Sequence, residues 1–145
     1  MLLASAICSC SEKQPETTEP MITKTEIQVE NGHFTPEIMH RLGKVGDVQV
    51  SPNHAKILYG VTYTSIEQNK GNRELYLMNV DGSENVKITN TPKSESNARW
   101  INDSQIIYMR SGKLYTATIE GSTLKNETEV AGAEGMESFE LSPAG

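Results

Sequence analysis

The sequence has few cysteines and none where they could cross-link a folded domain. Cys8 and Cys10 are its two cysteines, so the rest of the chain offers no disulfide and no thiolate zinc site. Basic residues are scarce as well: 13 Lys and Arg face 19 Asp and Glu, for a net charge of −6. Contacts to phosphate need a clustered basic surface, which argues against a nucleic-acid partner. Beyond the N-terminus, no apolar run is long enough to span a bilayer.

Motifs of catalysis are also missing. A serine hydrolase needs a Ser on a strained turn, usually within Gly-x-Ser-x-Gly, together with a His and an acid, and this pentapeptide does not occur. His33, His40 and His54 fall in a linker, a predicted helix and a predicted turn, where we expect surface or capping roles. Their spacing does not suit a metal, and Asp81-Gly82 lacks the alternating acids of a calcium loop. We therefore expect no catalytic residue, metal ligand or cofactor site.

The N-terminus carries a possible export signal. Ile7-Cys8-Ser9-Cys10 has the form of a bacterial lipobox, with an aliphatic residue at −3 and a small one at −1 before Cys10. We expect residues 1–10 to be a truncated signal peptide with Cys10 lipid-modified, and residues 11–33 to be a polar tether. Ordinary signal cleavage and an uninformative apolar start are the alternatives. The lipid anchor would place the protein in a bacterial cell envelope, periplasmic or bound to a membrane.

A short helix is predicted to lead from the tether into the domain. Thr35 can act as its N-cap, Pro36 suits the first helical position and Gly43 is a plausible terminator. We assign residues 34–46 to this lead-in segment.

From residue 47 onward the sequence repeats itself. The segment ELYLMNVDGS (74–83) is restated as KLYTATIEGS (113–122). Each copy belongs to a series of short strand patterns, and Val50, Trp100 and Leu141 occupy equivalent places 50 and 41 residues apart. Four short strands at such a period are typical of propeller blades, although a chance match of strands is a rival explanation. The predicted strands are DVQVSP, KILYGVTY, RELYLMNV and NVKITN, and then NARWI, QIIYMR, KLYTATIE and ETEVA.

The predicted fold class is therefore all-β. Residues 47–145 would form an incomplete β-propeller of four-stranded antiparallel blades: two blades and, from ESFELSPAG (137–145), the start of a third. Because closed propellers typically have four to eight blades, we expect the chain to be the N-terminal part of a longer protein.

Two of these stretches carry a family resemblance. VQVSPNHAKILYG (48–60) and ARWINDSQIIYM (98–109) resemble the Ser-Pro-Asp-Gly-type repeats of exported bacterial propellers. Such repeats occur in the prolyl oligopeptidase family of serine peptidases and in the propeller protein of the Tol system. The order of elements from the Thr-Pro-Glu helix (34–47) through residues 72–100 is similar to the start of the propeller in bacterial dipeptidyl-peptidase-like members.

The resemblance implies a function for the parent protein. It would be a cell-envelope serine exopeptidase whose propeller caps an α/β-hydrolase domain and filters peptide substrates, with the catalytic Ser, Asp and His in that downstream domain. Two alternatives remain open: an envelope propeller without enzymatic activity that binds protein partners, as in the Tol system, and a propeller that binds or cleaves carbohydrate.

Several residues stand out within this frame. Glu67, Glu74 and Glu95 could bind the N-terminal amino group of a peptide, but we expect all three to be solvated surface acids. For Trp100 and four tyrosines we expect packing between blades rather than ligand stacking; these are Tyr59, Tyr76, Tyr108 and Tyr115.

The segment TYTSIEQNKG (62–71) has no counterpart in the second repeat. We predict a protruding hairpin outside the four-stranded sheet, either a tolerated insertion or a flap toward a substrate or partner.

Overall fold

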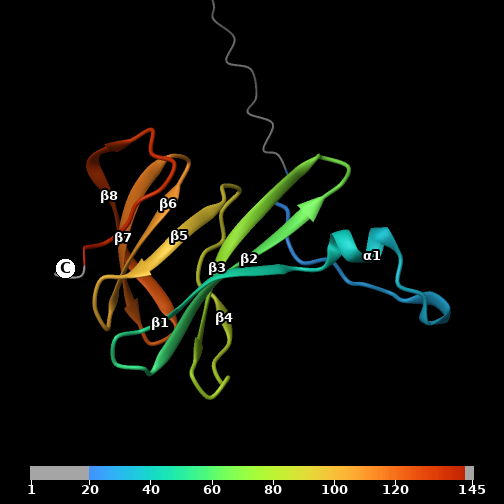
Figure 1. Ribbon diagram of the computed structural model, residues 1–145, viewed down its shortest axis with the longest axis horizontal. Helices are drawn as coiled ribbons and strands as arrows, with labels where there is room; N and C mark the ends of the chain where they lie inside the picture. The colour runs from blue at the N-terminus through green and yellow to red at the C-terminus, as the bar shows by residue number, and fades with distance from the viewer. Residues whose placement is uncertain (1–19, 143–145) are drawn as a thin grey trace, which may run out of the picture.

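Two four-stranded antiparallel sheets make up most of the protein (Figure 1). The computed structural model describes residues 20–142, and within each sheet the strands follow one another in sequence order. The fold is all-β and propeller-like, and its sheets do not close into a ring. The strands of the first sheet are β1 (Lys44–Val50), β2 (Lys56–Ser65), β3 (Lys70–Asn79) and β4 (Val86–Lys87). Those of the second are β5 (Glu95–Trp100), β6 (Gln105–Arg110), β7 (Lys113–Glu120) and β8 (Thr123–Glu134).

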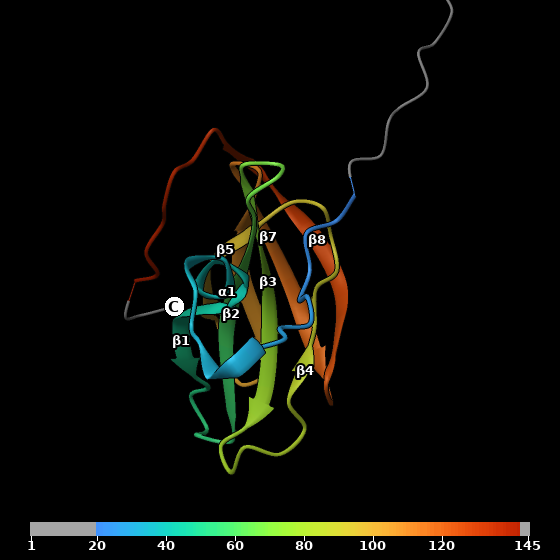
Figure 2. The same cartoon turned by 90° about the vertical axis from the view of Figure 1, so that its right-hand side faces the viewer.

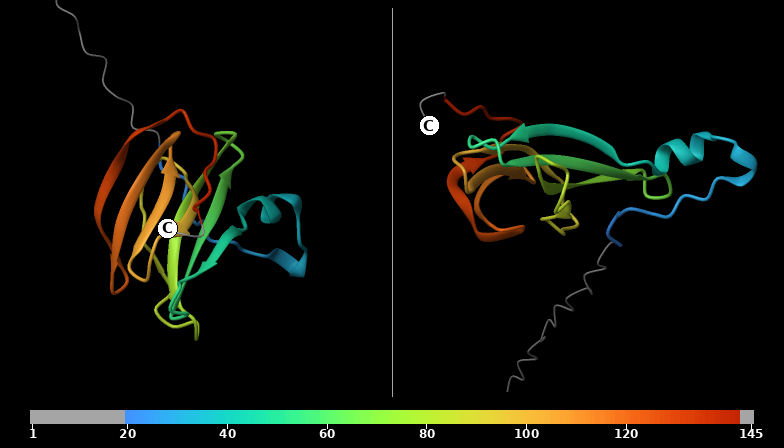
Figure 3. Two further views of the ribbon diagram at one scale, coloured as in Figure 1. Left: turned by 60° about the vertical axis from the view of Figure 1, so that its left-hand side comes forward. Right: turned by 90° about the horizontal axis from the view of Figure 1, so that it is seen from below.

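The predicted lead-in helix forms, but it is short. A 3₁₀ turn, η1 (Glu30–Gly32), precedes α1 (Pro36–Arg41). The backbone N–H of Ile38 donates to the Thr35 hydroxyl at 3.4 Å, so Thr35 is the N-cap as predicted. Because β1 already begins at Lys44, the helix occupies only the middle of the predicted segment 34–46. Figure 3 (right) shows η1 and α1 projecting from the first sheet on the side away from the second.

The repeat seen in the sequence is also a repeat in three dimensions. Both first strands carry a bulge at the same place, with Asp47 and Asn97 in the left-handed region at φ 51° and 53°. The cross-strand pair Tyr59 and Tyr76 stacks with ring centroids 5.5 Å apart. Its counterpart, Tyr108 and Tyr115, stacks at 6.0 Å. The gapless sequence match therefore reflects structurally equivalent positions in two sheets that share the same strand order.

The main core lies between the two sheets, whose strands run in similar directions (Figure 2). Trp100 is 8% exposed there, and its indole N–H donates to the Gln49 carbonyl of the first sheet at 3.3 Å. Trp100 and Tyr108 thus pack between sheets as expected, whereas Tyr59 and Tyr76 are half-buried on the other face of the first sheet. The core residues are Leu58, Leu75, Leu77, Ala98, Trp100, Ile106, Tyr108, Ala117 and Ile119.

A smaller cluster covers the far face of the second sheet. Ile107, Met109 and Leu114 are buried beneath residues from β8 and from the segment that follows it, including Phe139. The Asn97 side-chain amide donates to the Phe139 carbonyl at 2.9 Å and holds this segment in place. Residues 137–142 form no strand, so the described part of the predicted third repeat packs as an irregular cover. Residues 143–145 lie outside the described range.

The predicted insertion belongs to the sheet, which corrects our expectation. Residues 62–65 pair with residues 70–73 in register, from Thr62↔Arg73 to Ser65↔Lys70, and Thr62 also pairs with Lys44 of β1. The extra residues lengthen β2 and β3 and leave only 66–69 as a turn. The physical reason is that Thr62, Tyr63 and Thr64 are good strand formers, so the ladder continues where we had placed a loop.

One arginine spans the first sheet. The Arg73 guanidinium lies over Gly60 of β2 and Gly46 of β1, and its Nη2 reaches 2.8 Å from the Asp47 carboxylate. A Cβ atom added at Gly60 would lie 2.2 Å from Arg73 Nε. The two glycines therefore make room for an ion pair that crosses from the third strand to the first.

Candidate functional site

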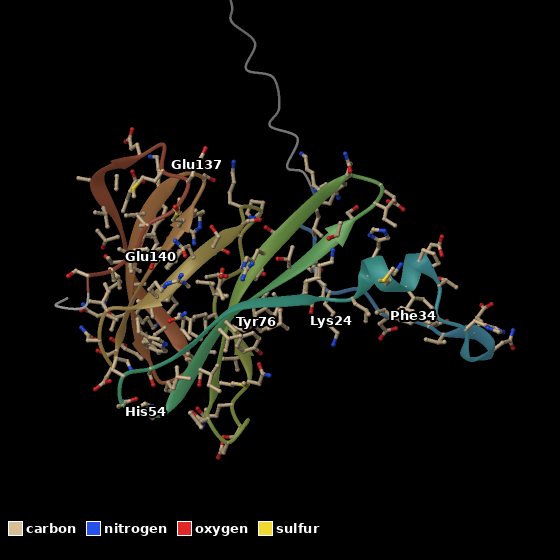
Figure 4. The ribbon with its side chains drawn as sticks, in the orientation of Figure 1. Lys24, Phe34, His54, Tyr76, Glu137 and Glu140 are labelled. Carbon is tan, nitrogen blue, oxygen red and sulfur yellow. The ribbon has the colours of Figure 1, made fainter. Side chains whose placement is uncertain are left out.

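The histidines named in the sequence do not assemble into a site. His33, His40 and His54 are all exposed, in agreement with surface roles, and Figure 4 shows His54 in the turn after β1. Within residues 20–142 no group of three or more His, Cys, Asp or Glu is placed to hold a metal. Cys8 and Cys10 lie outside the described residues, as does the predicted signal segment.

Two of the three glutamates contradict the prediction of solvated acids. Glu67 is exposed, but the exposed fractions of Glu74 and Glu95 are 1% and 0%. Glu74 lies on β3 of the first sheet and Glu95 on β5 of the second. The two acids are buried because residues of the β4–β5 connection, Thr89 and Thr91, hydrogen-bond to both.

The two buried carboxyl groups meet at one hydroxyl. Thr89, in the β4–β5 connection, places its Oγ1 2.7 Å from Glu74 Oε2 and 3.0 Å from Glu95 Oε2. Glu74 also accepts the backbone N–H of Thr91 at 3.1 Å and the side-chain amide of Asn72 at 3.3 Å. Sequence reasoning missed Thr89 and Thr91 altogether, since nothing in KITNTPK marks them as partners of distant acids.

An arginine extends this cluster to the surface. Arg110 Nε donates to Glu95 Oε1 at 2.7 Å, and its Nη1 and Nη2 donate to Glu127 of β8 at 2.7 and 2.9 Å. The guanidinium also lies over the rings of Tyr108 and Tyr115, 5.5 and 5.0 Å from their centroids, an arrangement that stabilises the cation. The Tyr108 hydroxyl donates to Glu127. We call the group Glu74, Thr89, Thr91, Glu95, Arg110 and Glu127 the intersheet polar cluster.

Protonation in the cluster follows burial and pairing. Burial raises the pKa of Glu95, and the nearby Glu74 carboxyl raises it further, against hydrogen bonds from Thr91 and Arg110. Hydrogen bonds from Arg110 lower the pKa of Glu127. Burial would lower the pKa of Arg110, but its bonds to Glu127 and Glu95 outweigh this effect and the pKa is raised. Burial and Glu127 together raise the pKa of Tyr108.

Three cavities adjoin these elements. One of about 390 Å³ lies over the polar cluster and is lined by Arg110, Glu127 and neighbouring residues. A cavity of about 180 Å³ brings Glu74 together with Lys24, Tyr76 and Lys87; Figure 4 shows Lys24 and Tyr76 near each other beside the first sheet. The third, of about 520 Å³, lies between residues 21–25, α1 and the tip of the β2–β3 hairpin. Together these features offer polar binding surfaces.

Comparison with known proteins points to a class of peptidase. No protein-family model matches the chain. A dipeptidyl-peptidase 5 of Porphyromonas gingivalis is 33% identical over 81 residues, which are 56% of this chain and 12% of that relative. A dipeptidyl-peptidase 5 of Porphyromonas endodontalis is 30% identical over 97 residues, 67% of this chain and 13% of the relative.

These matches relate the chain to the dipeptidyl peptidases. The chain spans about one eighth of the length of the curated relatives it matches.

Proposed function

We propose that this chain is the N-terminal propeller portion of a dipeptidyl-peptidase-like serine exopeptidase of the cell envelope. In this proposal further blades complete a ring, the ring caps a downstream α/β-hydrolase domain, and the cap filters peptides by size before they reach the catalytic Ser. A lipid on Cys10 would anchor the enzyme to a membrane. The similarity to two dipeptidyl-peptidase 5 proteins supports the substrate class.

The observation that carries the proposal is an uncovered sheet face. In the second sheet, Ala98, Trp100 and Tyr108 are 0%, 8% and 0% exposed because the first sheet covers them. Their equivalents in the first sheet are Val48, Val50 and Tyr59; the two valines are 56% and 49% exposed. Val80, in the turn that follows β3, is 52% exposed. The repeat thus presents an apolar face of the kind that another blade covers within the molecule.

The proposed blade contact can be tested by making one substitution both in the 145-residue chain and in the longer protein. Val50→Lys should leave the stability of the 145-residue chain within about 0.5 kcal/mol of the parent, because an exposed site tolerates a surface residue. In the longer protein the same change would bury a charge between blades and should lower the melting temperature clearly. Val29→Lys, at a site 51% exposed and outside both sheets, is the matched control. Equal behaviour of Val50→Lys in the two contexts would contradict the proposed blade contact.

Catalysis is tested separately. Purified 145-residue chain should not hydrolyse dipeptidyl reporter substrates or react with a fluorophosphonate probe for active-site serines, whereas the longer protein should do both. Reporter hydrolysis by the short chain above a blank preparation would refute the assignment of catalysis to a separate domain.

A further inference from the structure

The Thr89 hydroxyl has more acceptors around it than its single hydrogen can serve. Its Oγ1 already accepts the backbone N–H of Leu75 at 2.8 Å. It also contacts Glu74 Oε2 at 2.7 Å and Glu95 Oε2 at 3.0 Å. A hydroxyl donates one hydrogen and accepts through two lone pairs, so it can donate to only one of the two carboxyl groups. The other oxygen approaches a lone pair, and that distance is attractive only when this carboxyl carries a hydrogen.

We propose that Glu74, Thr89 and Glu95 share one proton and form a pH-sensitive joint between the two sheets. Glu95 Oε2 carries the proton and donates it to Thr89 Oγ1, and the Thr89 hydroxyl donates in turn to Glu74 Oε2. The chain of hydrogen bonds therefore runs from β5 of the second sheet to β3 of the first.

Burial places the proton on Glu95. Both carboxyl groups accept two further hydrogen bonds: Glu74 from Thr91 N–H and from Asn72, and Glu95 Oε1 from the Thr91 hydroxyl and from Arg110 Nε, each at 2.7 Å. Glu95 is 0% exposed, and burial is the largest influence on its pKa, which is raised in spite of the hydrogen bonds from Thr91 and Arg110.

Charged groups on several neighbouring elements face the three residues. Arg110 of β6 donates from Nε to Glu95 at 2.7 Å, and it forms a two-point ion pair with Glu127 of β8 that offsets the charge of the guanidinium. Lys24 and Lys87, from the N-terminal segment and β4, share a cavity with Glu74 and not with Glu95. Tyr108, the remaining titratable neighbour on β6, stays neutral because its pKa is raised.

Raising the pH removes the shared proton to solvent. Two buried carboxylates then face one hydroxyl hydrogen, and the second charge is left without water. Since the pKa of Glu95 in the folded protein lies above its usual value of 4.5, its contribution to stability is complete below about that pH. The contribution is lost as the pH rises through the folded value. Glu127 and Glu129, whose pKa values are lowered, show the opposite dependence and lose their contribution as the pH falls.

The test compares the urea stability of the full chain with that of Glu95→Gln from pH 4 to 9. A glutamine amide donates to Thr89 as the protonated acid does, at every pH. Between the ordinary glutamate value of about 4.5 and the folded pKa of Glu95, the ratio of the unfolding equilibrium constant of the parent to that of Glu95→Gln should rise roughly tenfold per pH unit, and it should level off above the folded pKa. Glu129→Gln is the control, because Glu129 is a carboxylate on β8 whose side chain is 40% exposed and paired with Lys113. A ratio that stays flat over the whole range from pH 4 to 9, or that falls with pH, would overturn the proposal.

A second measurement needs no stable Glu95 variant. With ¹³C-labelled glutamate carboxyl groups, one resonance should titrate well above the ordinary glutamate value of about 4.3, and Thr89→Ser should retain it. Thr89→Val, which removes the bridging hydroxyl, should shift that titration. If all glutamate carboxyl groups titrate in the ordinary range, no shared proton exists and the proposal fails.

Discussion

Adding one methyl group at Gly60 should break the ion pair that spans the first sheet. The new Cβ atom of Gly60→Ala would lie 2.2 Å from Arg73 Nε and 2.8 Å from its Cζ. Neither distance is compatible with van der Waals contact, so the guanidinium must move off the sheet and away from Asp47, which it reaches at 2.8 Å. The variant thus tests whether the Arg73 guanidinium needs the space that Gly60 leaves by having no side chain.

The expected loss follows from two contributions. Overpacking a filled site costs about 1–3 kcal/mol. The Arg73–Asp47 pair is partly exposed, with side chains 20% and 34% accessible, so losing it adds at most about 1 kcal/mol. We expect Gly60→Ala to lower the free energy of unfolding by about 2–3 kcal/mol, measured by urea denaturation followed by circular dichroism. At this chain length that corresponds to a fall in melting temperature of roughly 6–10 °C.

Two further variants show whether the clash with Arg73 causes the loss of stability. Gly71→Ala is the matched control in the same sheet, because its nearest neighbour, Thr62 Cγ2, lies at an ordinary 3.4 Å; we expect a change within about 0.5 kcal/mol. In an Arg73→Ala background, Gly60→Ala should cost much less than in the parent, since the clashing group is gone. An equal cost in both backgrounds, or no cost in the parent, would refute the reasoning.

Three further predictions concern the core, the anchor and the hairpin. Trp100→Ala should cost about 3–5 kcal/mol, because the indole is 8% exposed between the sheets; a loss below about 1 kcal/mol in urea denaturation would contradict its place in the core. In cells expressing the protein with a complete signal, Cys10→Ala should move it from the membrane to the soluble fraction while Cys8→Ala should not, and an unchanged distribution for both variants would favour simple signal cleavage. Replacing residues 65–70 with a Gly-Ser turn should cost little, because Thr64 and Gly71 are already paired and a two-residue turn can join them. A large loss of thermal stability would show that the hairpin tip supports the fold.

The sequence alone determined the class and repeat of the fold. Strand patterns ending in Asp81-Gly82 and in Gly121 marked the hairpins, because tight turns need residues that tolerate a positive φ, and both glycines have one, at 86° and 61°. The equivalence of Tyr76 and Tyr115 was likewise readable, since strand periodicity and turn chemistry are local properties. Thr35 was identified as a cap for the same reason.

Only the tertiary structure decided which side chains meet. Glu74 and Glu95 looked like ordinary surface acids because alternation within a strand says which residues share a face, and not whether that face is covered. The two sheets pack on each other and the β4–β5 connection contacts both carboxyl groups, so these polar positions became buried. The partners that make this possible come from far along the chain: Thr89, Arg110 and Glu127. Likewise, the length of the β2–β3 hairpin was decided by pairing with β1 through Thr62 and Lys44. Long-range pairing and burial depend on the whole arrangement of sheets, which no short stretch of sequence encodes.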